Sequence, residues 1–212
     1  FRYDGQKFRR FGLREGLPSA DIQSIHETRD GVMSVGTRSG VALRKNSRFE
    51  VVNTGEPLEI LGHSNIDSDD AGWVYISTTK GLIRIQPSSG GMPVQWIFHG
   101  SSRGVHVIRS GHVWAGCGQE LCRIDLQTGR VSRFGSEAGV PAENWDSLLG
   151  DSKGSLWLRS TAKVYERTAA GKMIDRTDGL PRTQQPARRL AVTSSGEMLV
   201  PTQNGLGIRE GE

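Results

Sequence analysis

Residues 31–37 read Gly31-Val-Met-Ser-Val-Gly-Thr37, a short run of β-branched and small residues that begins with a turn glycine. Four related stretches follow along the chain: Gly72-Trp-Val-Tyr-Ile-Ser-Thr78, Gly111-His-Val-Trp-Ala-Gly-Cys117, Gly154-Ser-Leu-Trp-Leu-Arg-Ser160 and Gly196-Glu-Met-Leu-Val-Pro-Thr202. The leading glycines of all five stretches lie 41, 39, 43 and 42 residues apart. Self-similarity at a period of this length indicates a repeat architecture.

Each repeat has the sequence pattern of four short strands. The stretch after the turn glycine has strand composition, and an apolar run before it, such as Ile22 to Ile25, supplies a hairpin partner. A second turn at Arg38-Ser-Gly40 leads into a third strand at Val41-Ala-Leu43, and a weaker fourth strand follows at Arg48 to Val52. In the last repeat, the fourth strand is expected at the front of the chain, at residues 6–11.

This pattern, with no helical periodicity, predicts an all-β fold: a β-propeller of five four-stranded antiparallel blades. Each blade has two apolar faces and is stable only between neighbours. We expect one domain over residues 1–212, with blades at about 12–54, 55–99, 100–135, 136–177 and 178–212. The N-terminal strand at 6–11 is expected to complete the last blade and close the ring. The alternative is that these blades are a fragment of a larger propeller.

Composition limits the function classes. The formal net charge is +4 and the isoelectric point about 9.3, but the basic residues are scattered over strands and turns, which argues against a nucleic-acid partner. No stretch approaches the roughly 20 apolar residues of a membrane span. The sequence shows neither an initiator methionine nor a signal peptide, so we expect a mature or excised piece of a longer protein.

The turn-plus-strand core resembles the two-component regulator propeller repeat. The residues that carry the resemblance are Gly16-Leu-Pro18, Asp30-Gly31, Val35-Gly-Thr37 and Gly40-Val41, with partial copies at Gly139-Val-Pro141 and Gly179-Leu-Pro181. The resemblance implies the extracytoplasmic sensor region of a bacterial hybrid histidine kinase or diguanylate cyclase. Such propellers usually have seven or fourteen blades, and this chain also departs from the pattern at Arg159, Pro201, Glu120 and Lys163, which stand where the repeat has glycine.

A ligand is expected on the face that carries the second-to-third strand turns and the blade connections, because loops on a rigid scaffold vary without disturbing the core. The candidate ligand-binding residues on this face are Arg38, Lys80, Glu120, Asn144, Trp145, Lys163, Gln203 and Asn204. Ordinary turn chemistry is the alternative explanation for the turn residues. Trp145 shares its position with Ile22 of the first repeat, so core packing is its alternative role.

Three polar residues occupy the same position, five before the turn glycine, in successive repeats. His26, Asp67 and His106 could approach one another near the channel wall, as a metal site or an acid–base pair. The alternative is a set of hydrogen-bonded structural polar residues, and we favour it. No nucleophile elbow, phosphate loop or metal motif is present, so no catalytic residue, metal or cofactor is predicted.

The two cysteines, Cys117 and Cys122, flank the second turn of the third repeat. A disulfide between them would require the two positions to lie directly opposite each other in the hairpin. Such a bridge would indicate an oxidising compartment.

Together these features predict a non-catalytic, ligand-sensing input domain of a bacterial membrane signalling receptor of the two-component type. The expected location is periplasmic, as the extracytoplasmic part of an inner-membrane protein whose membrane segments and kinase or cyclase domain lie outside these residues. The expected partners are a small-molecule or oligosaccharide ligand and, for signalling, a second copy of the propeller. The alternatives are a metal-dependent propeller lyase or hydrolase and a protein-interaction scaffold.

Overall fold

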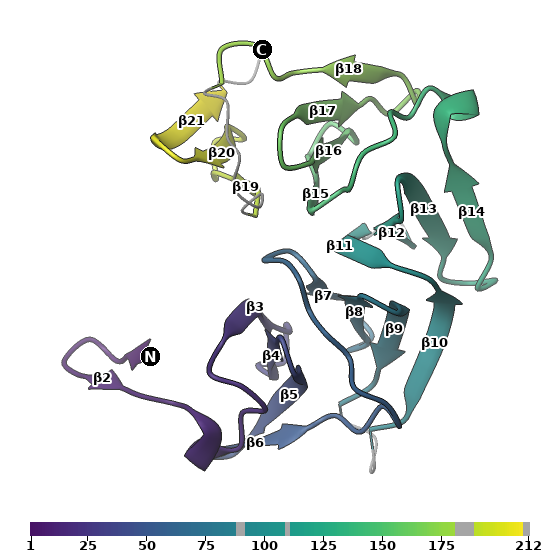
Figure 1. Cartoon of the computed structure of the whole chain (residues 1–212). Helices are drawn as coiled ribbons and strands as arrows, with labels where there is room; N and C mark the ends of the chain where they lie inside the picture. The colour runs from purple at the N-terminus through teal and green to yellow at the C-terminus, as the bar shows by residue number, and fades with distance from the viewer. Residues whose placement is uncertain (88–91, 109–110, 181–188, 210–212) are drawn as a thin grey trace.

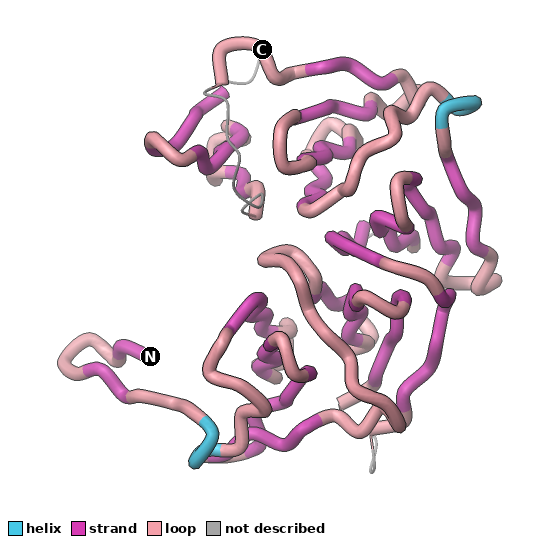
Figure 2. Tube along the Cα trace, viewed as in Figure 1, coloured by secondary structure: helices cyan, strands magenta, loops and turns pink. Residues whose placement is uncertain are grey.

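The computed structural model describes residues 1–87, 92–108, 111–180 and 189–209. Apart from two short 3₁₀ helices, η1 (Leu13–Glu15) and η2 (Ser136–Ala138), the regular structure in these residues is β-strand (Figure 2). None of the described helices is long and apolar enough to cross a bilayer.

The strands form five antiparallel sheets that follow one another around a centre, as the blades of a five-blade β-propeller (Figure 1). The first three blades are β3 (Ile22–Glu27), β4 (Met33–Thr37), β5 (Gly40–Lys45) and β6 (Arg48–Val51); β7 (Ile66–Ser68), β8 (Val74–Thr78), β9 (Gly81–Ile85) and β10 (Val94–His99); and β11 (Ser102–Ile108), β12 (His112–Cys117), β13 (Glu120–Asp125) and β14 (Val131–Phe134). The last two are β15 (Ser147–Gly150), β16 (Leu156–Arg159), β17 (Val164–Arg167) and β18 (Met173–Asp175); and β19 (Ala191–Val192), β20 (Met198–Thr202) and β21 (Gly205–Arg209). In each blade the first strand lies nearest the centre.

A polar side chain three residues before the turn glycine fixes the turn between the first two strands of four blades. The Thr28 hydroxyl accepts a hydrogen bond from the Val32 amide at 2.9 Å, and Thr193 does the same for Glu197 at 3.0 Å. Two aspartates serve this role in the second and fourth blades, and their second oxygen also holds an aromatic side chain: Asp69 accepts from Tyr75 Oη and Asp151 from Trp157 Nε1, each at 2.9 Å. Each turn is therefore tied to its own blade.

The hydrophobic core lies between blades. Val41 of the first blade packs in one cluster with Ile66 and Ile76 of the second, and Trp114 of the third blade packs with Leu148 and Leu158 of the fourth. Each sheet therefore buries its faces against its neighbours, as expected for short sheets that cannot bury both faces alone.

The expected ring closure by the N-terminal strand is wrong for the described residues. Strand β2 (Phe8–Arg9) pairs with β1 (Arg2–Tyr3), away from β21, whose partner is β20, so the last blade has three strands (Figure 1). The turn between β1 and β2 is fixed locally: the Asp4 carboxylate accepts hydrogen bonds from the Gln6 and Lys7 amides at 3.0 and 2.9 Å. Asp125 makes the same turn between β13 and β14, so the β1–β2 hairpin has the form of the outer half of a blade.

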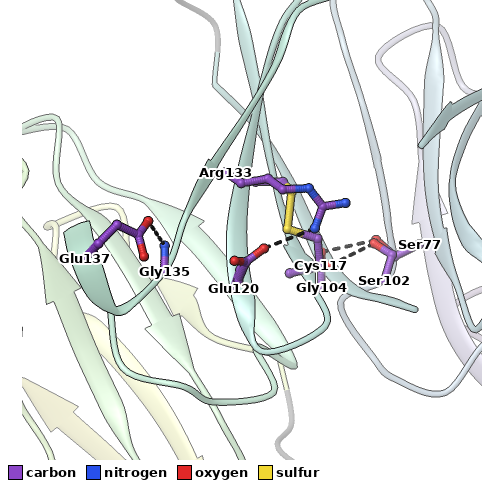
Figure 3. The surroundings of a disulfide bond; sticks show 10 residues. Ser77, Ser102, Gly104, Cys117, Glu120, Arg133, Gly135 and Glu137 are labelled. Atoms are coloured by element: carbon purple, nitrogen blue, oxygen red, sulfur yellow. Dashed lines mark hydrogen bonds and ion pairs between the residues drawn. A yellow bond between two sulfur atoms is a disulfide. The ribbon is translucent and has the colours of Figure 1, made fainter. Parts of the chain in front are cut away.

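A disulfide joins Cys117 of β12 to Cys122 of β13, with their Cα atoms 5.9 Å apart (Figure 3). Our condition that bridged cysteines must lie directly opposite each other is wrong. Cys117 faces Glu120, and Cys122 faces Ala115. The bridge is diagonal, between residues on one face of the sheet, and both cysteines are buried in the core between the second and third blades.

Candidate functional site

The charged residues expected to bind a ligand on the second-to-third turn face are paired with neighbouring charges. Arg38 Nε lies 2.7 Å from Asp21 Oδ2, and Lys163 Nζ lies 3.4 Å from Asp175 Oδ2. Glu120 accepts from Arg133 at 3.1 Å (Figure 3). Lys80 is paired in the same way with Glu56. These exposed pairs hold the turns against adjacent strands and connections.

The uncharged residues of this face divide into two groups. Asn144, Gln203 and Asn204 are exposed. Trp145 is fully buried and packs edge-on against Tyr165 at 5.7 Å between ring centroids. Its position in the core, the alternative considered from the sequence, removes it from the exposed face.

The structure brings His26, Asp67 and His106 together on three consecutive inner strands, β3, β7 and β11. His106 Nδ1 lies 3.0 Å from Asp67 Oδ2, and His26 Nδ1 lies 4.0 Å from Asp67 Oδ1. The register supports the shared position, because the partners of these residues on the second strands are Ser34, Tyr75 and Trp114, each three residues after its turn glycine.

These residues line a concave site of about 710 Å³, which we call the inner pocket. Its wall also includes Ser68, Trp73, Arg84 and Arg189, the last contributed by the chain just before β19. Turn residues between first and second strands complete it: Arg29, Asp69, Asp70, Ala71 and Gly111. Because neighbouring strands run antiparallel, these turns lie at the opposite end of the blades from the face where a ligand was expected.

Burial and nearby charges change the protonation of the central residues. Burial lowers the pKa of His26 below its ordinary value; the Arg189 charge acts in the same direction and Asp67 opposes both. Burial alone would raise the pKa of Asp67, but hydrogen bonds from His106 and the Val107 amide outweigh it, so that pKa is lowered. Asp67 is therefore a partly buried carboxylate that stays ionised at neutral pH.

The hydrogen bonds of the trio fit a structural polar network. Asp67 Oδ1 accepts from the Ser68 amide at 2.9 Å, and His26 Nε2 lies 2.8 Å from Ser68 Oγ. A Cβ at Gly150 would lie 3.1 Å from His106 Nε2, so that nitrogen faces the fourth blade. Within the described ranges, no three His, Cys, Asp or Glu side chains converge in the manner of a metal site.

Sequence reasoning missed most of the pocket wall. Arg189 was passed over because it belongs to a local Arg188-Arg189 pair with no strand pattern; residues 181–188 lie outside the described residues. Trp73 and Arg84 lie at other positions of the repeat, and the Arg84 guanidinium covers the Trp73 ring at 4.3 Å. The position five before each turn glycine indicated only His26, Asp67 and His106, and no sequence signal pointed to the rest of the wall.

No family model matches the chain, and neither does any curated protein. Solved structures do match. The extracellular domain of the putative hybrid two-component system BT3049 from B. thetaiotaomicron matches with a TM-score of 0.70 at 18% identity, over 89% of this chain and 27% of that one. A gluconolactonase from Xanthomonas campestris matches at 0.68 and 13% identity, over 89% and 71% of the two chains.

Virginiamycin B lyase from Staphylococcus aureus matches with a TM-score of 0.66 at 11% identity, over 93% of this chain and 72% of that one. At these identities the likeness shows the propeller fold alone. This chain spans about a quarter of the length of the two-component domain that it matches.

Proposed function

We propose that this propeller is the ligand-sensing, extracytoplasmic input domain of a bacterial membrane signalling receptor of the two-component type, and that it catalyses no reaction itself. The observation that carries the proposal is the inner pocket: a polar concavity whose central carboxylate and histidines are engaged with one another and with the backbone. A concavity of this size, with Trp73 and several polar side chains in its wall, supports ligand binding.

Three further observations support the proposal. The repeat motifs resemble those of two-component regulator propellers. Extracellular domains of putative hybrid two-component systems are among the solved structures of the same fold. The Cys117–Cys122 disulfide is typical of proteins from oxidising compartments.

The pocket wall suggests how binding could be transmitted. It combines residues of the first three blades with Arg189, which precedes the last sheet. A ligand that contacts both the first three blades and Arg189 stabilises one arrangement of the blades over others. It shifts the equilibrium between these arrangements because it binds one of them more tightly. In this proposal a second copy of the propeller responds to that shift through its contact with the first. The connection to the membrane is made only by segments outside these residues.

A propeller lyase or hydrolase is the second candidate, and one observation favours it. An Asp67–His106 contact of 3.0 Å in a pocket is an arrangement that general-base catalysis uses. The orientation of His106 Nε2 toward Gly150 argues against it, because this leaves that nitrogen facing a neighbouring strand.

A thermal-shift screen with neutral and charged metabolites and oligosaccharides tests the proposal. A ligand that binds only the folded state at 100 times its Kd stabilises by about 2.7 kcal/mol, which is a measurable rise in Tm. Each hit is then incubated with the protein and recovered for mass spectrometry, and the protein is analysed for divalent metal. An unchanged hit supports sensing, and conversion of the hit with stoichiometric metal supports the enzyme.

Two matched variants locate the site. Ala71→Trp adds bulk to an exposed residue of the inner pocket, and Ala142→Trp adds the same bulk to an exposed residue next to Asn144 on the other face. We expect only Ala71→Trp to abolish the Tm shift. No hit from a broad panel would favour a protein-interaction scaffold instead.

A further inference from the structure

We propose that the inner pocket takes a small organic anion, with its oxyanion group lying against Arg189. This inference rests on the proposed function and names the class of ligand. It follows from counting which charges in the pocket wall are already engaged within the protein.

The carboxylates of the pocket have their acceptor capacity in use. Asp67 accepts from His106, Val107 and Ser68. Both oxygens of Asp69 are taken up by its own turn and by Tyr75. Asp70 is the exposed exception, and it faces the Arg29 guanidinium at 3.5 Å. The pocket thus offers a ligand few free acceptors.

Two of the three arginines in the wall are also engaged. Arg29 faces Asp70. Arg84 donates through Nε to Gln95 Oε1 at 2.9 Å and lies over the Trp73 ring. Their positive charge is therefore shared with protein groups.

Arg189 differs from both. Among the residues that the structure describes, no carboxylate lies within ion-pair distance of its guanidinium, and the side chain is exposed beside the pocket. It lines the inner pocket together with His26. A negative charge placed beside Arg189 is stabilised by it.

The chemistry of Arg189 selects the ligand class. A guanidinium presents a planar fork of N–H donors that matches the two oxygens of a carboxylate or the oxygens of a phosphate. A neutral ligand of the same shape would leave Arg189 without a countercharge. We therefore expect the site to prefer an acid over its neutral counterpart.

Isothermal titration of the whole chain tests this with paired probes: glucuronate and glucose 1-phosphate against glucose, and succinate against succinamide, followed by a library of other acids paired with their amides or alcohols. We expect acids to bind and their neutral partners to bind at least about tenfold more weakly, a difference of about 1.4 kcal/mol. The glucuronate and glucose 1-phosphate arms separate a carboxylate from a phosphate ligand.

Arg189→Ala and Arg189→Lys are the diagnostic variants, and Arg130→Ala is the matched control, since Arg130 is an exposed arginine that does not line the inner pocket. We expect Arg189→Ala to weaken binding about tenfold or more, Arg189→Lys to weaken it less, and Arg130→Ala to change it less than twofold. Circular dichroism confirms that each variant is folded.

The outcomes separate the two proposals. Neutral compounds that bind as well as acids, or acids whose affinity is unchanged by Arg189→Ala, overturn the anion inference and leave the sensing proposal standing. A library in which neither acids nor neutral compounds bind overturns both.

Discussion

At the scale of single residues, one partly buried carboxylate, Asp67, connects two inner strands. Asp67 contacts His106, and accepts hydrogen bonds from the Val107 amide on the neighbouring blade and from its own strand at Ser68. Hydrogen bonds to a charged group are stronger than neutral ones, and a buried group left without partners is costly. The Asp67 side chain is therefore a link between the second and third blades.

We predict that Asp67→Asn lowers the free energy of unfolding by about 2 to 3 kcal/mol at pH 7, because the bonds to an ionised acceptor are lost. The pKa of Asp67 is lowered in the folded state. Its contribution to the free energy of unfolding is therefore fully present above the unfolded-state pKa of about 3.9, and it is lost as pH falls through the folded-state pKa. Urea unfolding at pH 7 and pH 3 should show the variant and the native chain converging at acidic pH.

Asp70→Asn is the control, because Asp70 is exposed and its contact with Arg29 is long, so a change within about 0.5 kcal/mol is expected. Equal losses for the two variants at pH 7 would contradict the role given to Asp67.

A second residue-scale prediction compares two glycines at the same place in the Gly-Leu-Pro-like openings. Gly16 and Gly139 both have positive φ, 96° and 72°. A Cβ at Gly16 would lie 2.1 Å from the Phe49 carbonyl oxygen, whereas a Cβ at Gly139 has nothing within 4 Å. Gly139→Ala should cost about 1 to 2 kcal/mol from the left-handed backbone alone. Gly16→Ala should cost at least about 2 kcal/mol more because of the clash. Chemical denaturation of both variants measures the difference, and equal costs would exclude the clash as a cause.

At the scale of strands and turns, the repeat period was enough to predict the sheets. The turn glycines and the strand pattern that follows them predicted second strands at the observed places, because turn and strand preferences depend mainly on neighbouring residues. The ring closure was not predictable in this way: the Asp4 turn accounts for the pairing of β2 with β1, whereas pairing with β21 depends on how distant parts of the chain meet.

The ligand face shows the same limit. The candidate residues Arg38, Lys80 and Lys163 have suitable chemistry, but the carboxylates that engage them come from connections and outer strands that the repeat pattern does not align with them. The inner trio was predictable because the position five before the turn glycine is a fixed point of the repeat. Arg189 required the three-dimensional arrangement of the blades.

The disulfide gives the element-scale prediction. It links β12 to β13 across a sequence separation of 5, and a loop this short restricts the unfolded chain only modestly. Reduction should therefore lower the free energy of unfolding by about 2 kcal/mol, which guanidinium denaturation with and without dithiothreitol measures. A Cys117→Ala/Cys122→Ala double variant should show no response to reductant. Unfolding of the whole chain on reduction would mean that the bridge holds more than its own hairpin.

At the scale of the whole molecule, the central sheets of the described residues are more deeply buried than the last one. Every residue of β8 is buried, whereas β21 is largely exposed and Leu206 and Ile208 lie open to solvent. In repeat architectures, stability is approximately the sum of each unit's own stability and its nearest-neighbour interfaces. Terminal sheets should therefore open at lower free energy than central ones.

Native-state hydrogen exchange with mass spectrometry measures this gradient. We predict the slowest exchange in β8, β9, β12 and β13, faster exchange in β20, and the fastest in the β1–β2 hairpin, which pairs with no blade among the described residues. Comparing β8 with β20 is the controlled test, because both are second strands of their sheets. Equal protection of these two strands would mean that an interface on the last sheet supplies the missing neighbour. A ligand in the inner pocket should slow exchange in β3, β7 and β11 and in the segment that carries Arg189, while leaving β13 unchanged, because the pocket wall joins these inner strands to the start of the last sheet.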